Sequence, residues 1–249
     1  ELEQGGYEHH CFSENEIGQH KKLGRVWKKI IKLTEIEPPA RLFELGCGGG
    51  IHLAKLALNG FEVHGIDVSD TVAEKAQNYL HEINTFQTIK ASLEVADVFE
   101  YSGSEIYQMS FHFGVIEHFL ESSDRLKIWQ ILYDLTLPGG WIVSVVPCGQ
   151  HFMREMMRNQ RLGGYNIPEI DYSCSFHHEE FNQINLTSIS TIPHNYFSFL
   201  SAHPFPLISK VLHPLFFAVG NLSLPYLPIS NAIKEHFAGS LIVVGQKPL

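Results

Sequence analysis

The stretch that decides the fold reads Arg41-Leu-Phe-Glu-Leu-Gly-Cys-Gly-Gly-Gly50, an apolar run closed by a glycine-rich turn. Apolar residues at helical spacing resume at Ile51. The segment therefore predicts a buried strand, a tight turn and a helix. Glycines in such a turn let a ligand approach the backbone, and the helix that follows points its first amides at the ligand. Close packing between strand and helix would explain the same glycines without any ligand.

A carboxylate at the end of the next expected strand supports a ligand site at the glycine turn. Phe61–Ile66 predicts a second strand, and Asp67 ends it about 20 residues after Gly46, where an acid can accept hydrogen bonds from two ribose hydroxyls. Glu44 precedes the turn, and its negative charge is a poor neighbour for a pyrophosphate but suits an ammonium or sulfonium group. Both features favour a positively charged adenosine ligand, with a nicotinamide-dependent oxidoreductase as the alternative.

The rest of the chain continues the alternation of strands and helices, which predicts a doubly wound α/β fold. Further strands are expected at Phe86–Ala91, Ile106–Phe113, Trp141–Val146, Asn185–Ile192 and Ser240–Gly245, and helices at Lys21–Leu33, Asp70–His81 and Ser123–Thr136.

Two blocks, Leu42–Gly50 and Val63–Ser69, resemble the first two motifs of class I S-adenosylmethionine-dependent methyltransferases of the small-molecule type. Phe111–Phe119 is similar to the end of that family's fourth strand, Leu135–Val143 to its turn into the fifth, and Leu241–Pro248 to its last strand. The resemblance implies a Rossmann-like, seven-stranded sheet that is mostly parallel, with an antiparallel last strand and helices on both faces.

The resemblance also implies one methyltransferase domain over residues 1–249. Its expected parts are an N-terminal helical lid (1–36), a cofactor-binding core (37–148), a substrate-recognition insertion (149–239) and a closing strand (240–248).

S-adenosyl-L-methionine is the cofactor that the resemblance implies, with S-adenosyl-L-homocysteine as its product. The expected contacts are Glu44 with the methionine amino group, the backbone of Gly46, Cys47 and Gly48 with methionine and ribose, Asp67 with the ribose hydroxyls, and Val68 with adenine. Members of the family often place an acid after the third strand for the adenine amino group. The matching place here reads Ala91-Ser92-Leu93, so Ser92 and Leu93 are expected as weaker substitutes.

Residues after the fourth strand lie beside the methyl group in this family. Phe113 and Gly114 are therefore expected at the cofactor, and Glu117 and His118 as catalytic residues, with His118 the leading general base or substrate contact. The alternative is that Glu117 and His118 brace the next helix. In-line methyl transfer gains most from positioning, so it needs no further motif.

Other histidines do not predict a metal site. His9-His10 and His177–Glu180 place possible ligands side by side, but adjacent side chains diverge, and His177–Glu180 is expected to open a helix, where carboxylates are favourable. Tyr7 and His10 are expected in an N-terminal lid that contacts the substrate, with a frayed tail as the alternative.

The amino-acid composition disfavours some classes of partner and some locations. The formal net charge of -9 disfavours a nucleic-acid acceptor. The four cysteines form no Cys-x-x-Cys pair, a pattern that suits a cytoplasmic protein, and no signal peptide is visible. Prolines 214, 225 and 228 interrupt the apolar stretch Val211–Ile233, so no transmembrane segment is expected.

The aromatic segment Tyr196–Ile233 lies between the last two expected strands, where this family places substrate-recognition insertions. Phe197, Phe199, Phe216 and Phe217 are expected to line an apolar pocket or lid. Alternatively the segment is an exposed patch that meets a membrane, a second copy in a homodimer, or a fused or partner domain.

The function expected is methyl transfer to an oxygen, nitrogen or carboxylate of a small, fairly apolar acceptor, such as a secondary metabolite, a modified peptide or a lipid-related compound. Two alternatives remain open. Ile116–Phe119 is also similar to lipid cyclopropane synthases, which favours lipid C-methylation or cyclopropanation. A non-catalytic regulator that binds S-adenosylmethionine is the other.

Overall fold

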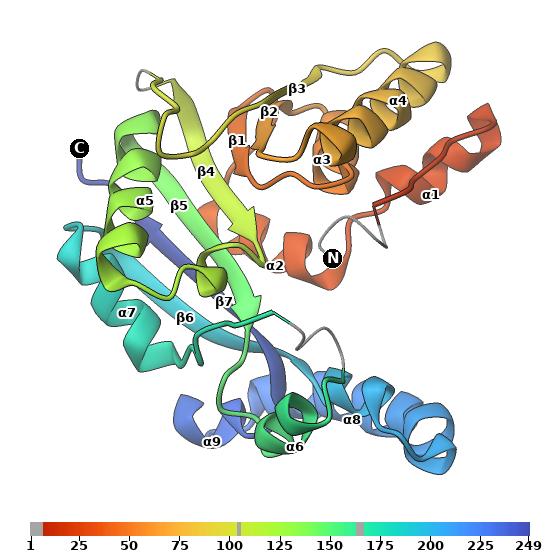
Figure 1. Cartoon of the computed structure of the whole chain (residues 1–249), viewed down its shortest axis with the longest axis vertical. Helices are drawn as coiled ribbons and strands as arrows, with labels where there is room; N and C mark the ends of the chain where they lie inside the picture. Colours follow the sequence, from red (N-terminus) through yellow and green to blue (C-terminus); the bar gives the residue numbers. More distant parts are fainter. Residues whose placement is uncertain (1–6, 104–105, 163–166) are drawn as a thin grey trace. The chain divides into compact units, whose positions relative to one another are not determined.

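A seven-stranded sheet organises the chain, in the order β3-β2-β1-β4-β5-β7-β6 (Figure 1). The computed structural model describes residues 7–103, 106–162 and 167–249. The strands are β1 (Arg41–Leu45), β2 (Glu62–Asp67), β3 (Ala91–Val95), β4 (Tyr107–Phe113), β5 (Thr136–Pro147), β6 (Thr187–Tyr196) and β7 (Ala238–Gln246). Four of the five residues of β1 are buried, as expected for a strand inside a parallel sheet.

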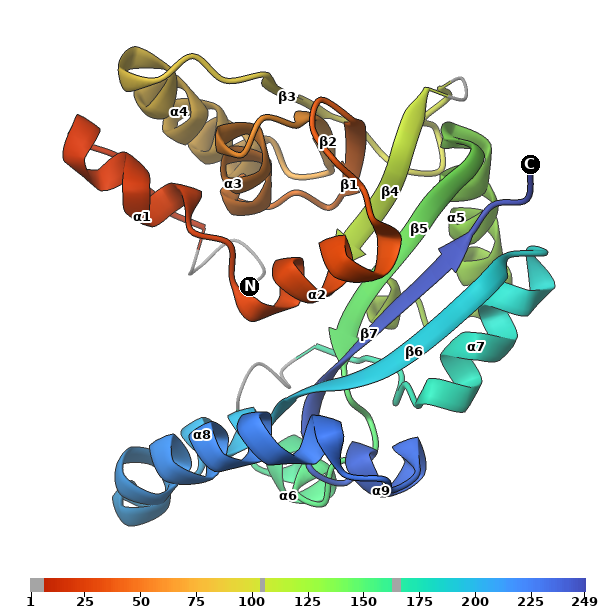
Figure 2. The same cartoon turned by 180° about the vertical axis from the view of Figure 1, so that it is seen from behind.

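Strands β1 to β4 are parallel and in a regular register. Phe43 in β1 lies opposite His64 in β2 and Ser110 in β4. Asp67, the last residue of β2, lies opposite Val95 of β3. The last strand runs the other way: Gly139 donates its N–H to Lys247 O at 3.0 Å, and Lys247 donates to Gly140 O at 2.9 Å. The mostly parallel sheet with an antiparallel last strand is thus confirmed (Figure 2).

The helices are α1 (Ile17–Lys21), α2 (Arg25–Thr34), α3 (Ile51–Leu58), α4 (Asp70–Phe86), α5 (Ser122–Leu135), α6 (Arg154–Asn159), α7 (Cys174–Gln183), α8 (His213–Ser223) and α9 (Asn231–Glu235). Short helical turns are η1 (Glu14–Glu16), η2 (Ile116–His118), η3 (Ser198–Ala202), η4 (Leu207–Leu212) and η5 (Leu224–Tyr226). Ser69 caps α4, and its hydroxyl accepts the N–H of Val72.

Several expected elements differ from the structure. The helix expected at Lys21–Leu33 begins only at Arg25, because Lys22 and Gly24 have an extended backbone. The strand expected at Phe86–Ala91 is wrong, because the buried helical spacing of α4 continues through Ile83 to Phe86 and the strand that pairs with β2 begins only at Ala91. Strand β5 begins at Thr136 rather than Trp141, since Gly139 and Gly140 pair with Lys247 even though Gly139 has a φ of 75°. Helix α7 begins at Cys174, capped by Ser173, so His177–Glu180 lies inside the helix rather than opening it.

The chain groups into two compact units. The first comprises Glu1–Phe113, Lys127–Val143 and Val244–Leu249, and the second comprises Gly114–Leu126 and Ser144–Val243. In the first unit, buried Trp27 of α2 packs edge-on against Phe111 of β4 and donates its indole N–H to His52 of α3 at 3.0 Å. This contact ties α2 and α3 to the sheet beside the glycine turn.

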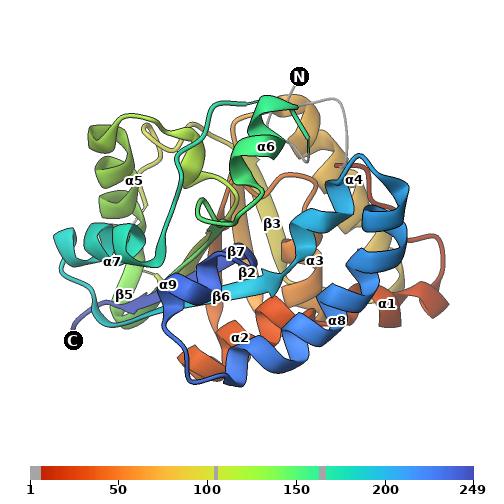
Figure 3. The ribbon, with the colours of Figure 1, turned by 90° about the horizontal axis from the view of Figure 1, so that it is seen from below.

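In the second unit, a helical segment follows β6 and corrects one expectation. The expectation that Pro214 interrupts the apolar stretch is wrong, because the helix runs continuously from Leu207 to Tyr226 (Figures 2 and 3). Pro214 stands where the π-helical segment η4 passes directly into α8, the point at which the pattern of backbone hydrogen bonds changes. By length and composition, this is the one candidate for crossing a membrane among the described residues.

Candidate cofactor and catalytic residues

The glycine turn and Asp67 are joined directly. The N–H of Gly48 donates to Asp67 Oδ2 at 2.9 Å, and the N–H of Ser69 donates to Asp67 Oδ1 at 3.1 Å. Each carboxylate oxygen keeps a second lone pair. Asp67 can therefore brace the turn and still accept hydrogen bonds from a ligand at the carboxyl ends of β1 and β2, where parallel sheets bind their ligands.

Tyr7 lies against this turn, and the turn has room for it only because residue 48 is glycine. Gly48 has a φ of 51°, and a Cβ placed there would come within 2.9 Å of Cε1 of Tyr7. His9 also approaches the turn, at Gly49. His10 points elsewhere: its Nδ1 lies 3.0 Å from Oε1 of Glu82 in α4, on an exposed surface. The structure thus brings Tyr7, but not His10, to the glycine turn.

The carboxylate of Glu44 is buried, and one of its oxygens has no hydrogen-bond partner. Its side chain is 1% exposed, and Oε2 has no hydrogen-bond partner. Burial, reinforced by the negative charge of Asp67, raises the pKa of the Glu44 carboxyl well above its usual range. A buried anion of this kind is stabilised by a cation. The amino group of S-adenosylmethionine is such a cation, so Glu44, Asp67 and the glycine turn fit this cofactor.

Cys47 and Val68 also have environments that suit their expected roles. Burial raises the pKa of the Cys47 thiol, which keeps it protonated and unreactive, and a Cβ at Gly65 would lie 2.8 Å from the Cβ of Cys47. Cys47 is therefore a small packing residue. Val68 follows Asp67 and is 73% exposed, an unusual exposure for a β-branched aliphatic side chain, and it offers an apolar surface to a flat ring.

Ser92 and Leu93 lie inside strand β3, not after it. They are opposite His64 and Gly65, and the Ser92 hydroxyl is 2.9 Å from Nδ1 of His64. The residues that do follow β3 are Ala96, whose N–H donates to Asp67 O at 3.0 Å, and exposed Asp97. Sequence reasoning missed Asp97 because it ended α4 too early; the helical spacing through Ile83 was the signal for the correct register.

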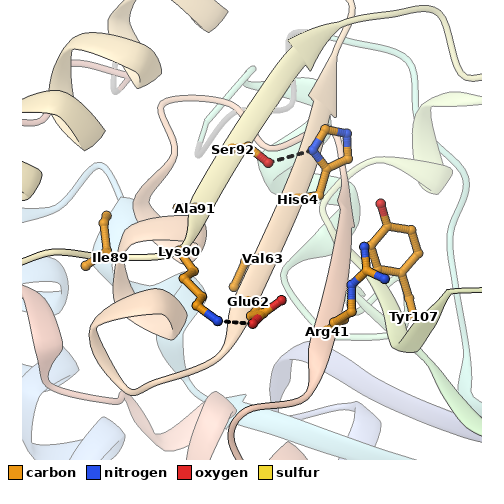
Figure 4. A pocket seen from close by; sticks show the side chains of 9 residues that line it. All are labelled: Arg41, Glu62, Val63, His64, Ile89, Lys90, Ala91, Ser92 and Tyr107. Carbon is orange, nitrogen blue, oxygen red and sulfur yellow. Dashed lines mark hydrogen bonds and ion pairs between the residues drawn. The ribbon is translucent and has the colours of Figure 1, made fainter.

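Ser92 instead lines a hollow of about 360 Å³ at the other end of the strands (Figure 4). Its walls come from the starts of β1 to β4: Arg41, Glu62, Val63, His64, Ile89, Lys90, Ala91, Ser92 and Tyr107. An ion pair between Lys90 and Glu62 crosses it. Ligands of open α/β sheets bind at the opposite, carboxyl ends, so this hollow is separate from the cofactor residues.

Phe113 closes β4 and is held by stacked rings. Its ring centroid lies 4.1 Å from that of His52 and 5.3 Å from that of Trp27. Burial lowers the pKa of His52 to about 3, so the imidazole is neutral and Nδ1 is free to accept the Trp27 N–H. These ring contacts hold the Phe113 side chain in place at the end of β4.

In the second unit, Gly114 begins the segment with the predicted catalytic residues. It has a φ of 66° and donates its N–H to Val145 O at 2.8 Å. Glu117 and His118 lie in η2, before α5. Glu117 is 1% exposed with Oε2 unpartnered, and burial, with a smaller effect of Glu169, raises its pKa to about 8 while Arg154 opposes the shift. The Glu117 carboxyl therefore holds its proton near neutral pH.

His118 and Glu169 complete this cluster. His118 Nδ1 lies 3.4 Å from the carbonyl oxygen of Pro168, and Glu169 pairs with Arg154 at 2.7 Å. Ligand atoms of Glu117, His118 and Glu169 lie within 4.8 Å of one another, a geometry that could hold a metal ion, as could Cys11, Glu16 and His20 in the first unit. The expected absence of a metal stays a prediction.

A buried ion pair fixes the chain just after this cluster. Arg125 Nε donates to Glu180 Oε1 at 2.7 Å, and the Tyr172 hydroxyl donates to the other oxygen at 2.7 Å. Arg125 Nη1 donates to the carbonyls of Phe119 and Leu120 at 2.9 and 2.8 Å. The sequence analysis missed Arg125; an arginine inside an otherwise apolar helix face was its only signal.

Three of the four predicted substrate aromatics, Phe197, Phe199 and Phe216, are connected by ring contacts. Phe199 is 6% exposed and stacks on His151 at 4.3 Å, within a core cluster around Met153 and Met157. Phe197 contacts Phe199 and Phe216, whereas Phe217 lies against His213. Phe216, which is 43% exposed, is therefore the one of the four best placed to meet an apolar molecule.

The strand order, the glycine turn and the Asp67 link together define a Rossmann-like methyltransferase fold. The family described as "Methyltransferase domain" matches residues 19–191. The chain therefore belongs to the S-adenosylmethionine-dependent methyltransferases with this domain, which confirms the resemblance.

Individual relatives are more distant. The chain is 28% identical over 145 residues to the ubiquinone biosynthesis O-methyltransferase of Shewanella sp. (strain ANA-3), a match that covers 51% of this chain and 59% of that protein. It thus spans less than two thirds of that relative.

Two solved structures illustrate the fold. One is phosphoethanolamine N-methyltransferase 2 of Haemonchus contortus in complex with S-adenosyl-L-methionine, with a TM-score of 0.59, 16% identity, and coverage of 95% of this chain and 58% of that one. The other is a SAM-dependent methyltransferase from Archaeoglobus fulgidus, with a TM-score of 0.60, 13% identity, and coverage of 94% and 95%.

Proposed function

We propose that this chain transfers the methyl group of S-adenosylmethionine to an oxygen atom of a small, fairly apolar acceptor. The observation that carries the proposal is the buried carboxylate of Glu44, whose Oε2 has no hydrogen-bond partner, in the strand that leads into the glycine turn. Gly48 of that turn donates its N–H to Asp67. When bound, S-adenosylmethionine supplies an electrophilic methyl group. Glu44 holds its ammonium group, and Asp67 holds its ribose.

The acceptor class rests on the curated relatives. Those matched at 28% identity are named as O-methyltransferases of ubiquinone biosynthesis, which supports an oxygen acceptor on an apolar molecule. A hydroxyl that attacks a methyl group must lose its proton, and Glu117 and His118 are the candidates to take it. Glu117 suits the task because its pKa of about 8 lies close to ordinary working pH.

Isothermal titration with S-adenosylmethionine and S-adenosylhomocysteine tests the cofactor. We expect both to bind the folded chain, with Asp67→Ala and Glu44→Gln each weakening the binding; no binding by the folded chain would refute the proposal. Incubation of an extract with isotopically labelled cofactor, followed by mass spectrometry, tests the acceptor, and the labelled product should carry a new methyl ether or ester.

The alternatives predict other products. A label on a carbon atom or in a cyclopropane ring would favour lipid C-methylation or cyclopropanation. Tight cofactor binding without any labelled product would favour a non-catalytic regulator.

A further inference from the structure

The segment from Leu207 to Tyr226 is an apolar helix whose outer side is uncovered. Five aliphatic side chains recur every three or four residues and form one stripe, each more than half exposed: Leu207, Val211, Leu215, Val219 and Leu222. Tyr226, at the end of the helix, is 84% exposed. A helix that is apolar on its outward side is unstable in water and marks a surface that meets something apolar.

The inner side of the same helix is held by the second unit. Ile208 packs on the cluster around Met153 and Phe199. The Asn221 amide donates to Tyr196 O at 3.0 Å and its oxygen accepts the Tyr196 N–H at 3.3 Å. A Cβ at Gly220 would lie 2.6 Å from the ring of Phe197. Because contacts hold this side at Ile208 near one end and at Gly220 and Asn221 near the other, the helix is placed to lie on a surface rather than to cross a membrane.

Three polar side chains of the helix donate hydrogen bonds to backbone carbonyl groups. Ser223 donates its hydroxyl to Val219 O at 2.8 Å, Ser209 to Phe205 O at 3.4 Å, and Asn221 to Phe217 O at 2.7 Å as well as to Tyr196. Hydroxyls and amides that are satisfied by the helix's own backbone can enter an apolar medium at little cost. A protein partner would instead be recognised through polar groups directed outward.

The distribution of charge distinguishes between a lipid bilayer and a second copy of the chain as the partner of this surface. The chain carries a formal charge of -9, yet no Asp or Glu lies between Glu180 and Glu235, where the only Lys or Arg residues are Lys210 and Lys234. In a two-fold dimer the surface would meet itself, so exposed Lys210 would find no carboxylate there. An anionic lipid surface attracts Lys210 and tolerates this acid-free region, whereas it repels the rest of an acidic chain.

We propose that the outer stripe of the Leu207–Tyr226 helix docks this chain on an anionic lipid bilayer, with the helix lying in the membrane interface. Its aliphatic side chains enter the boundary between headgroups and acyl chains, and Lys210 lies at the level of the lipid phosphates. This inference goes beyond the proposed methyl transfer and does not depend on the identity of the acceptor.

Vesicle flotation with the full chain tests the proposal. We expect the chain to float with vesicles of phosphatidylcholine mixed with phosphatidylglycerol, and less with phosphatidylcholine alone. Leu215→Glu and Leu222→Glu should each lower the partition coefficient by about tenfold. Lys210→Glu should weaken binding to the mixed vesicles and leave binding to phosphatidylcholine unchanged.

Leu249→Glu is the matched control, because Leu249 is fully exposed in the other unit and the substitution adds the same charge. It should float as the unaltered chain does. All variants should keep their melting temperature and cofactor affinity, since the altered side chains are exposed.

Two outcomes would overturn the proposal. One is equal flotation of the chain and both leucine variants. The other is no flotation, together with a dimer that Leu222→Glu dissociates in sedimentation equilibrium, which would make the stripe an interface between two copies.

Discussion

Gly48 and Asp67 are joined by a hydrogen bond of 2.9 Å from the Gly48 N–H to Asp67 Oδ2. The bond links the turn after β1 to the end of β2, and Asp67 Oδ1 accepts a second N–H, from Ser69. Asp67 thus sets the shape of the turn before any ligand arrives. Preorganised contacts of this kind lower the cost of binding because little has to be ordered afterwards.

Asp67→Asn should weaken S-adenosylmethionine binding by roughly ten- to a hundredfold, because hydrogen bonds to a charged group contribute about 1.5 to 3 kcal/mol. The asparagine oxygen can still accept the Gly48 N–H, so the turn should persist. Titration calorimetry measures the change. Asp70→Asn, in the first turn of α4, is the control and should bind normally; an unaltered affinity in Asp67→Asn would show that Asp67 only braces the turn.

Glu44→Gln should raise stability and lower cofactor affinity at the same time. The folded-state pKa of Glu44 lies well above its ordinary value because of burial, with Asp67 adding to the effect. Its contribution to stability is therefore fully present below the ordinary pKa and is lost as pH rises through the folded-state pKa. The free energy of unfolding of Glu44→Gln should exceed that of the unaltered chain at pH 8, and the two should converge near pH 4.

Urea unfolding at the two pH values checks the stability, and calorimetry with S-adenosylmethionine checks the binding. A variant that gained stability and bound the cofactor normally would remove Glu44 from the site.

Glu117→Gln should change the pH dependence of methyl transfer. A carboxylate that takes a proton must first be ionised, and the pKa of Glu117 is raised to about 8 by burial. The kcat/KM should therefore rise about tenfold per pH unit below this value and level off above it. Glu117→Gln should lose this slope and about a hundredfold in rate at pH 8. Any slope that persists in the variant belongs to a group other than Glu117.

His118→Ala separates the two candidates, since it should reduce kcat with little change in cofactor affinity. Glu121→Gln, in the exposed loop before α5, is the control and should keep the normal profile.

Removing only one partner of the Arg125–Glu180 ion pair should lower the free energy of unfolding. Both side chains are at least 95% buried, so Glu180→Gln leaves an uncompensated guanidinium and should lower the free energy of unfolding by about 3 kcal/mol. Replacing both, as Arg125→Met with Glu180→Leu, should restore most of it. Denaturant unfolding measures each variant. A double variant as unstable as the sum of its single changes would mean that the two groups do not act as a pair.

Much of the first unit could be predicted from its sequence, because β1, the glycine turn and Asp67 are local patterns with a strict order. The β1 range was correct at both ends. Contacts between segments that are distant in the sequence could not be predicted. No local pattern around His10 indicates that it contacts Glu82, and none around Arg125 indicates that it pairs with Glu180. The apolar helix at Leu207–Tyr226 was missed because prolines suggest a break, whereas the helix continues through Pro214 at the point where η4 passes into α8.

The register of β3 leads to the last prediction, because the strand ends at Val95 opposite Asp67 and places Asp97 just beyond it. An acid after the third strand is what the family resemblance led us to expect at the adenine amino group. Asp97→Asn should weaken S-adenosylhomocysteine binding by about three- to tenfold, the effect of one hydrogen bond. Ser92→Ala should bind normally, since Ser92 contacts His64 in the separate hollow.

The S-inosylhomocysteine analogue, which carries a carbonyl in place of the adenine amino group, makes the test specific. The unaltered chain should discriminate against the analogue, and Asp97→Asn should discriminate much less, because the pair that senses the amino group is gone. Asp97 Oδ1 also accepts the N–H of Phe99 at 2.9 Å. If Asp97→Asn weakened the binding of S-adenosylhomocysteine and of the analogue equally, Asp97 would act only by shaping its turn. Recognition of the adenosine part would then depend on Val68 and Asp67.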